Sequence, residues 1–110
     1  MKTIIYFVSE DWYFCSHRLP IARKALAKGF KVVVVTRVDK HQDVIESEGF
    51  ELAPIEIKRG GVNLFFEFKT ISTLYSYYKK YNPDIVHHVA IKPVIYGTLV
   101  AKLIGSMKIV

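Results

Sequence analysis

Two cations and two glycines stand side by side in the middle of this sequence. Lys58 and Arg59 come directly before Gly60 and Gly61, and a long helical pattern starts at Asn63. Glycine amides and nearby cations at the start of a helix can hold a phosphate or a carboxylate. A plain surface turn has the same composition, so the stretch is either an anion-binding loop or an ordinary turn.

A second concentration of polar residues follows the first apolar run. Glu10 and Asp11 are adjacent, and neighbouring carboxylates in a loop more often cap a helix or hold an arginine than work as an acid–base pair. His17 and Arg18 stand where we expect the first helix to begin, with Ser16 as its cap, so free amides there could bind an anion. A simple capped surface helix explains the same residues equally well.

A pair of adjacent histidines raises the question of a metal site. Neighbouring residues of a strand point to opposite faces, so His87 and His88 cannot bind one ion together. We therefore expect no metal, and we expect one of the two to line a ligand cleft; the pattern favours neither. Cys15 lacks a base and an orienting partner nearby in the sequence, so we interpret it as a packed thiol.

The glycine pattern excludes the usual nucleotide-binding turns. Residues 9–15 contain no glycine, whereas a dinucleotide fold needs glycines there so that the pyrophosphate can approach the backbone. The sequence also lacks a phosphate loop ending in Gly-Lys-Ser or Gly-Lys-Thr. No Asp-x-Asp pair is present to hold magnesium beside a sugar nucleotide.

Length and composition fit one globular domain over residues 1–110. Of its 110 residues, 51% are hydrophobic and 24% are charged, which excludes a disordered chain. Lys and Arg number 16 and Asp and Glu number 10, so the net charge is 16 − 10 = +6, which favours anionic partners. Basic residues and aromatics are scattered, so we expect no nucleic acid. One cysteine indicates a reducing compartment, and no apolar run is long enough to span a membrane.

Short β-branched runs alternate with longer helical patterns along the chain. Strands are expected over residues 3–9, 31–36, 52–57, 84–88 and 108–110, and helices over 16–28, 40–48, 63–81 and 93–103. Pro54 places the third strand at a sheet edge. With right-handed crossovers, this order gives a doubly wound, Rossmann-like parallel α/β sheet with strand order 3-2-1-4-5. Ligands of such sheets bind at the carboxyl ends of the strands, here residues 9–15, 36–39, 58–63 and 87–93.

The longest helical pattern carries aromatic residues on two sides. One set recurs at helical spacing, which predicts a buried stripe of Leu64, Phe68, Ile71, Tyr75 and Tyr78. A second set lies off that stripe, beside lysines, and comprises Phe65, Phe66, Tyr77 and Tyr81. Such a face either rests on an anionic membrane surface or makes edge contacts within the domain.

Several short motifs, in this order and spacing, resemble one enzyme family. They are Ser-His-Arg at 16–18, Ala-Lys-Gly-Phe-Lys-Val at 27–32, Arg-Gly-Gly at 59–61, Asn-Pro-Asp-Ile-Val-His at 82–87, Lys-Pro at 92–93 and Tyr-Gly at 96–97. The chain resembles the amino-terminal domain of the family-4 glycosyltransferases, which have the two-domain GT-B architecture. It looks especially like bacterial members that build capsule, lipopolysaccharide or N-glycan precursors on a lipid diphosphate.

The resemblance implies a retaining transfer of a sugar from a nucleotide donor, expected to be UDP-linked, to a lipid-linked or polysaccharide acceptor. It implies that this half binds the acceptor and touches an anionic membrane peripherally at its cytoplasmic face. A donor-binding half would follow Val110, so this truncated half is expected to be inactive alone, and no metal or other cofactor is expected. Catalytic residues stay unassigned. The acceptor- and phosphate-binding positions that the resemblance implies are Trp12, His17, Arg59, Gly60, Gly61, His88 and Lys92. There the cations would neutralise a diphosphate, and an aromatic side chain could stack on a sugar face.

Two other functions stay open. The first alternative is a non-catalytic membrane-docking or scaffold subunit that needs a separately encoded donor-binding partner. The second is another nucleotide-sugar enzyme of the same architecture, such as an epimerase, with its catalytic residues in the half that follows. A downstream segment with glycine loops and paired glutamates favours the transferase, and a stop after Val110 favours the scaffold.

Overall fold

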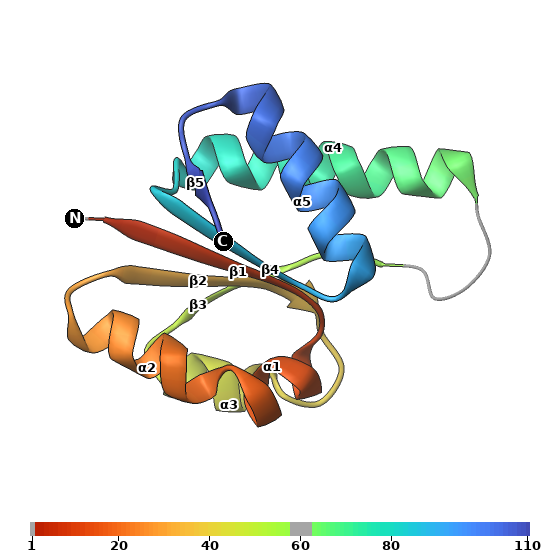
Figure 1. Ribbon diagram of the computed structural model, residues 1–110. Helices are drawn as coiled ribbons and strands as arrows, with labels where there is room; N and C mark the ends of the chain where they lie inside the picture. Colours follow the sequence, from red (N-terminus) through yellow and green to blue (C-terminus); the bar gives the residue numbers. More distant parts are fainter. Residues whose placement is uncertain (1, 58–62) are drawn as a thin grey trace.

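The computed structural model describes residues 2–57 and 63–110 and contains one parallel sheet between two helical layers (Figure 1). Its strands are β1 (Thr3–Glu10), β2 (Lys31–Arg37), β3 (Glu51–Pro54), β4 (Ile85–Val89) and β5 (Lys108–Ile109). They lie side by side in the order β3-β2-β1-β4-β5, and every neighbouring pair is parallel. The Rossmann-like α/β fold and the strand order predicted from the sequence are therefore confirmed.

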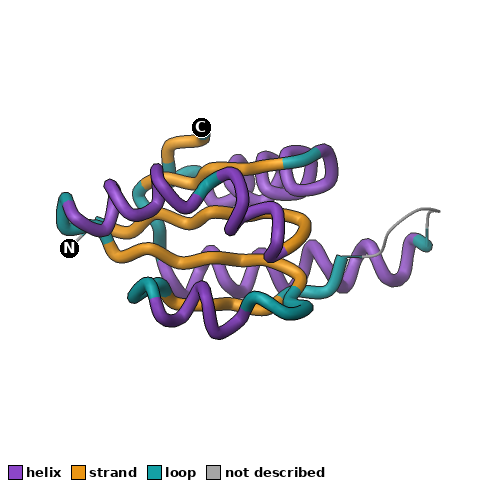
Figure 2. The backbone as a smooth tube through the Cα atoms, turned by 90° about the horizontal axis from the view of Figure 1, so that it is seen from below, coloured by secondary structure: helices purple, strands orange, loops and turns teal. Residues whose placement is uncertain are grey.

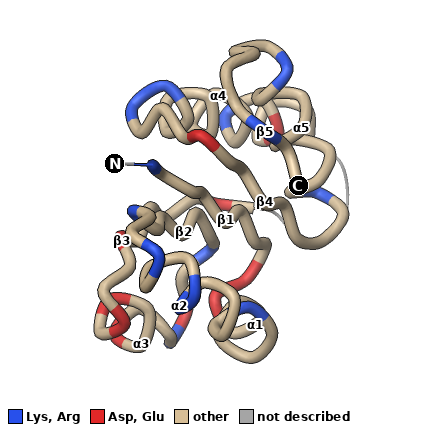
Figure 3. The backbone as a smooth tube through the Cα atoms, turned by 60° about the vertical axis from the view of Figure 1, so that its left-hand side comes forward, with Lys and Arg blue, Asp and Glu red and all other residues tan. Residues whose placement is uncertain are grey.

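Helices cover both faces of the sheet. The first layer consists of α1 (Asp11–His17), α2 (Leu19–Ala27) and α3 (Gln42–Ser47), and the second of α4 (Leu64–Tyr81) and α5 (Ile91–Ile104) (Figure 1). The amino-terminal turns of α4 extend past the ends of the strands, as Figure 2 shows. Lys and Arg lie on α2, α4 and β5 rather than along one stripe (Figure 3).

The central strand β1 is buried on both faces because helices lie above and below it. Ile5 and Phe7 belong to the core beneath α4 and α5. Ile4, Tyr6 and Val8 belong to the core on the opposite face, beneath α1 and α2. Burial of each such side chain stabilises the fold by about 1.5–3 kcal/mol. An uninterrupted apolar run is therefore the expected sequence of this strand.

The sheet edge and the helix ends follow the predicted local chemistry. Pro54 lies in the edge strand β3, where a missing backbone N–H is tolerated. Gly29 follows α2 with a φ of 95°, a left-handed conformation that glycine adopts without strain. Asn82 caps α4 in the same region with a φ of 46°.

The helix expected over residues 16–28 is present as α2, but it begins only at Leu19, and a helix that was not expected, α1, precedes it. Helix α1 begins directly after β1, where the Asp11 carboxylate accepts the backbone N–H of Trp12 at 2.8 Å. Ser16, expected as a cap, lies in the last turn of α1. The chain breaks at Arg18, and α2 starts beyond it because Pro20 has no N–H to continue the first helix.

The buried stripe predicted for the long helix is confirmed only in part. Tyr78 is buried and Ile71 packs against the core, but Tyr75 is exposed. The buried positions of α4 are Glu67, Thr70, Leu74 and Tyr78. Of the expected stripe, Leu64 and Phe68 are 80% and 74% exposed. The cause is the position of the helix: its first turns lie beyond the strands and have no sheet to pack on (Figure 2).

Candidate functional site

A β-bulge shapes the carboxyl end of β1, where sheets of this kind bind ligands. The pairing register between β1 and β2 shifts between Val8 and Glu10, which leaves Ser9 without a partner on β2. Beyond the shift, Glu10 stands opposite Arg37. The bulge therefore brings an acidic and a basic side chain together at the ligand edge of the sheet.

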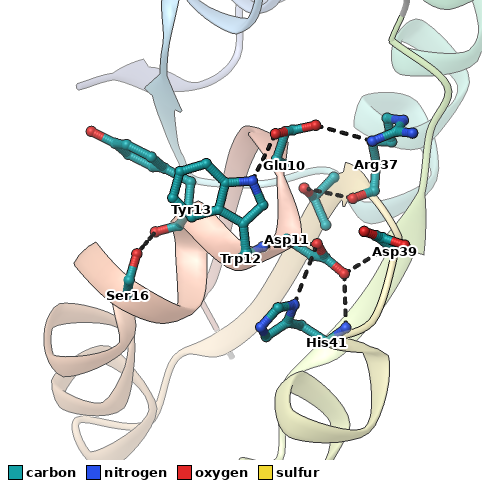
Figure 4. A network of polar contacts seen from close by, with 9 residues as sticks. Glu10, Asp11, Trp12, Tyr13, Ser16, Arg37, Asp39 and His41 are labelled. Atoms are coloured by element: carbon teal, nitrogen blue, oxygen red, sulfur yellow. Dashed lines mark hydrogen bonds and ion pairs between the residues drawn. The ribbon is translucent and has the colours of Figure 1, made fainter.

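Glu10 joins three elements through its two carboxylate oxygens. The Trp12 indole Nε1–H donates to Oε2 at 2.7 Å, and the Arg37 guanidinium donates to Oε1 at 3.0 Å (Figure 4). Glu10 itself is buried, whereas Trp12 is 46% exposed. The carboxylate therefore fixes an exposed indole ring at the end of the central strand.

Asp11 is fully buried and fixes the loop between β2 and α3. Its carboxylate accepts the backbone N–H groups of Asp39 at 2.7 Å, His41 at 2.9 Å and Trp12 at 2.8 Å (Figure 4). Burial alone would raise the pKa of Asp11, but these donors and the nearby His41 ring together hold it below its usual value. The interpretation that one of these carboxylates holds an arginine is confirmed, because Glu10 pairs with Arg37. Glu10 is also the N-cap residue of α1, but its side chain makes no capping hydrogen bond.

Three aromatic rings follow one another along α1. Trp12 meets Tyr13 edge-on, with ring centroids 5.6 Å apart. Tyr13 stacks on His17 with centroids 4.3 Å apart, and the Ser16 hydroxyl lies 2.8 Å from His17 Nδ1. His17 thus lies in the last turn of α1, so the expectation of a helix start with free amides at this residue is wrong.

The two histidines of β4 point to opposite faces, as their alternation predicted. His87 lies against the Tyr6 ring, and His88 against the Phe7 ring. Burial lowers the pKa of His87, and the Arg18 charge lowers it further. Among the described residues, no group of three His, Cys, Asp or Glu side chains could hold a metal ion.

His88 is buried against α4 and α5, and only 7% of it is exposed. Its Nε2 lies 2.8 Å from the Tyr78 hydroxyl, and burial lowers the pKa of His88 to about 4, with a smaller contribution from His87. Its buried Nδ1 has no hydrogen-bond partner in the part of the chain that the structure describes. A Cβ on Gly97 would lie 2.2 Å from Nε2, so only glycine lets α5 approach this ring.

The start of α5 combines backbone strain with an ion pair. Ala90 precedes the helix with φ 82° and ψ 165°, a conformation that residues with a Cβ rarely adopt. Two residues later, the Lys92 ammonium lies 3.0 Å from the carboxylate of Glu67, which is 9% exposed. This pair links α5 to α4.

The structure therefore divides the implied binding residues into separate groups. Trp12 and His17 share one aromatic surface on α1, Lys92 pairs with α4, and His88 is a core residue. Arg59, Gly60 and Gly61 lie outside the described residues. A hollow between the end of β3 and α4 is lined by Pro54, Ile55, Glu56, Phe66, Lys69, Thr70 and Thr73.

Sequence reasoning missed the residues that hold these groups in place. The pairing of Glu10 with Arg37 depends on the bulge. The pairing of Glu67 with Lys92 joins two helices through residues that are 25 positions apart in the sequence. Strand order was the one available signal for the first pair, because it makes the ends of β1 and β2 neighbours. No local pattern indicates the second pair.

The fold and its ligand edge define a parallel, Rossmann-like α/β domain. A family model described as "Glycosyl transferase 4-like" matches residues 3–110, so the chain belongs to this family. No curated protein matches the sequence well enough to add to that assignment.

Solved structures share the fold at low sequence identity. MurG of Acinetobacter baumannii superposes with a TM-score of 0.77 at 18% identity, over 99% of this chain and 34% of that one. A glycosyltransferase of Rickettsia africae superposes with a TM-score of 0.72 at 18% identity, over 98% of this chain and 28% of that one. The C-terminal domain of the PF1911 hydrogenase of Pyrococcus furiosus superposes with a TM-score of 0.71 at 12% identity, over 98% of this chain and 89% of that one. These likenesses show the GT-B type of Rossmann-like fold, and the chain spans about a third of the length of the two glycosyltransferases.

Proposed function

We propose that this chain is the acceptor-binding half of a glycosyltransferase that moves a sugar from a UDP-linked donor to a lipid-linked or polysaccharide acceptor. The family match over residues 3–110 supports the reaction class. The acceptors are those used to assemble capsular polysaccharide or lipopolysaccharide. In this proposal the donor nucleotide binds to a second domain, no metal takes part, and the half described here has no activity alone.

The start of α1 is the observation that carries this division of labour. In nucleotide-binding sheets, free amides after the first strand receive the phosphates. Here the second amide of α1, that of Trp12, already donates to the Asp11 carboxylate. A buried carboxylate at this position repels a phosphate, and the turn contains no glycine that would let one approach. The carboxyl edge of β1 therefore suits the sugar part of an acceptor better than a nucleotide or a diphosphate.

Lys92 is the described residue best suited to the acceptor diphosphate. It lies in the first turn of α5, and its ammonium has three N–H donors, so it can bind a phosphate beside Glu67. In the proposal, Arg59, Gly60 and Gly61 complete that site, and Trp12 and His17 contact the sugar. Lys92 is thus a phosphate-binding residue of the acceptor site.

The exposed apolar end of α4 supports contact with a membrane. Leu64, Phe65 and Phe68 are 80%, 87% and 74% exposed, and Lys69 follows them. Apolar side chains beside a cation bind the interface of an anionic bilayer. Among the described helices, none is both long and apolar enough to cross a membrane. We place the protein peripherally at the cytoplasmic face, where lipid-linked acceptors are used.

The same surface favours a second function, a membrane-docking or scaffold subunit without catalysis. Ile91, Ile95 and Leu103 of α5 are 78%, 57% and 66% exposed, so a second apolar surface accompanies that of α4. Such surfaces suit a subunit that recruits a separate donor-binding partner. One property distinguishes the two functions. The acceptor-binding half of a transferase binds the lipid diphosphate itself, and a scaffold subunit does not.

Calorimetric titration of the chain with two ligands tests the proposal. A short-chain lipid diphosphate sugar is expected to bind, and UDP is expected to give no heat of binding. Lys92→Ala should weaken the lipid diphosphate about tenfold. Lys102→Ala, on the same helix, is the matched control and should leave the affinity unchanged. Binding of UDP alone would overturn the division of labour, and binding of neither would favour the scaffold.

Co-sedimentation with vesicles tests the membrane contact. Phe65→Ser and Phe68→Ser together should remove most binding to vesicles that contain phosphatidylglycerol. Tyr75→Ser is the control, because Tyr75 lies on the same helix but is only 39% exposed. Equal binding by all three proteins would refute a role for this end of α4.

A further inference from the structure

The Trp12 side chain is exposed, yet a hydrogen bond fixes the orientation of its ring. Folding alone does not require an exposed aromatic ring to be held in one orientation. Its ring stands at the end of the central strand with 46% of its surface exposed. The indole N–H donates to Glu10 at 2.7 Å, and Arg37 holds the other oxygen of that carboxylate at 3.0 Å. A charge-assisted hydrogen bond of this kind fixes the plane of the ring before any ligand arrives.

The aromatic surface continues along the same helix. Tyr13 supports one edge of the indole, with centroids 5.6 Å apart, and His17 stacks on Tyr13 at 4.3 Å. Three rings in contact leave the indole little freedom to turn away. Preorganised aromatic surface binds a flat partner at a small cost in conformational entropy.

The charges around the ring select against a phosphate-bearing partner. The network beside Trp12 holds the carboxylates of Glu10 and Asp11 and the guanidinium of Arg37 (Figure 4). Although the whole chain carries a net charge of +6, two carboxylates outnumber one guanidinium in this network. A nucleotide is therefore disfavoured, while a neutral ligand is tolerated.

We propose that the face of the Trp12 indole stacks on a neutral pyranose ring of the acceptor, with Glu10 as the positioning residue that fixes the indole. The axial C–H groups of a pyranose form a weakly apolar face with positive partial charge, which is attracted to the negative face of an indole. The Arg37 side chain, which is 42% exposed, lies within reach of the hydroxyl groups at the sugar rim. This inference rests on the proposed function, since it names the part of the acceptor that binds at this edge.

The chain contains a single tryptophan, so its fluorescence reports on this site alone. Titration with methyl β-glucopyranoside, methyl β-galactopyranoside and N-acetylglucosamine should change the Trp12 emission with a dissociation constant of about 1 mM or weaker. UMP should leave the emission unchanged. Saturation-transfer NMR on the same sugars gives a second readout, one that does not depend on the tryptophan.

Variants separate stacking from a general loss of structure. Trp12→Ala should abolish saturation transfer to the sugar, whereas Tyr75→Ala, at an exposed aromatic on α4, should leave it unchanged. Glu10→Ala should weaken binding about threefold to tenfold and lower the fluorescence anisotropy of Trp12, because the freed ring rotates. Glu10→Gln keeps an oxygen that can accept from the indole, and it should restore most of the anisotropy.

Three results would overturn the inference: unchanged sugar binding in Trp12→Ala, an emission change with UMP but with no pyranoside, or unchanged anisotropy in Glu10→Ala. Its failure is distinguishable from failure of the proposed function. If the lipid diphosphate binds in calorimetry while Trp12 stays silent to every sugar, only the stacking is wrong. If UDP alone binds, the proposed function is wrong.

Discussion

The carboxyl ends of the two central strands are built in opposite ways. At the end of β1, the carboxylates of Glu10 and Asp11 accept donors from an indole, a guanidinium and three backbone amides. At the end of β4, His88 keeps a buried Nδ1 without a partner among the described residues, and Ala90 takes a φ of 82°. One end is fixed by hydrogen bonds, and the other by close packing that leaves strain.

The comparison indicates a different task for each end. A saturated polar network holds a rigid surface, as the exposed Trp12 requires. Strained backbone persists only where the surroundings impose it, and it concentrates at functional sites. Ala90 leads into the helix turn that carries Lys92, the proposed phosphate-binding residue. We therefore interpret the β1 end as the sugar side of the acceptor site and the β4 end as its phosphate side.

Removing the Asp11 carboxylate should have the largest effect. Asp11→Ala leaves three backbone N–H groups without their acceptor, which should lower the free energy of unfolding by about 4 kcal/mol. Urea denaturation measures the change. Asp39→Ala is the control, since its backbone N–H and not its side chain makes the bond to Asp11, and it should cost less than about 0.5 kcal/mol. Equal losses in the two variants would contradict the role given to Asp11.

Gly97→Ala tests the close packing at the β4 end. Alanine is favoured over glycine in a helix by about 1 kcal/mol, but its Cβ would lie 2.2 Å from His88 Nε2. The clash should outweigh the gain in helix propensity and lower the free energy of unfolding by about 2 kcal/mol net. In a His88→Ala background the ring is absent, so the same substitution should become neutral or stabilising. A cost that persists there would show that His88 is not the obstacle.

Titration of His88 should make the fold sensitive to acid. Its pKa is lowered from 6.5 to about 4 in the folded protein, so between those values the unfolded chain binds more protons. The contribution of neutral His88 to the free energy of unfolding is therefore fully present above pH 6.5. The free energy of unfolding should fall by about 2 kcal/mol as the pH drops toward 4. His88→Gln should remove most of this slope, and His87→Gln a smaller part. An unchanged slope in His88→Gln would contradict the burial of a neutral histidine.

Ala90→Gly should give the smallest change in the free energy of unfolding, and that change should be an increase. Relief of the positive φ is worth about 1–3 kcal/mol, and the added freedom of glycine in the unfolded chain costs about 0.4–1 kcal/mol. The net stabilisation of about 1 kcal/mol would appear as a higher denaturation midpoint. Ala101→Gly, within ordinary helical backbone of α5, should instead destabilise. A loss of stability in Ala90→Gly would show that the backbone there is not strained.

Sequence patterns were sufficient for the sheet but not for the contacts between its layers. Strand order follows from apolar runs and from Pro54, and the opposite directions of His87 and His88 follow from strand alternation. The start of α1 could not be predicted, because Asp11 is satisfied by amides 28 and 30 residues away. The stripe predicted for α4 failed at Leu64 and Phe68, because the sequence does not show that the first turns of this helix extend beyond the strands.

Amide chemical-shift mapping of the isotope-labelled chain tests the central claim most directly. The lipid diphosphate sugar is expected to shift amides at both strand ends, those of Trp12 and His17 after β1 and that of Lys92 after β4. UDP is expected to shift none of them. If UDP shifts the amides of Trp12 and Lys92 and the lipid diphosphate does not, the carboxyl edge of this sheet binds the donor, and the proposed acceptor site is wrong.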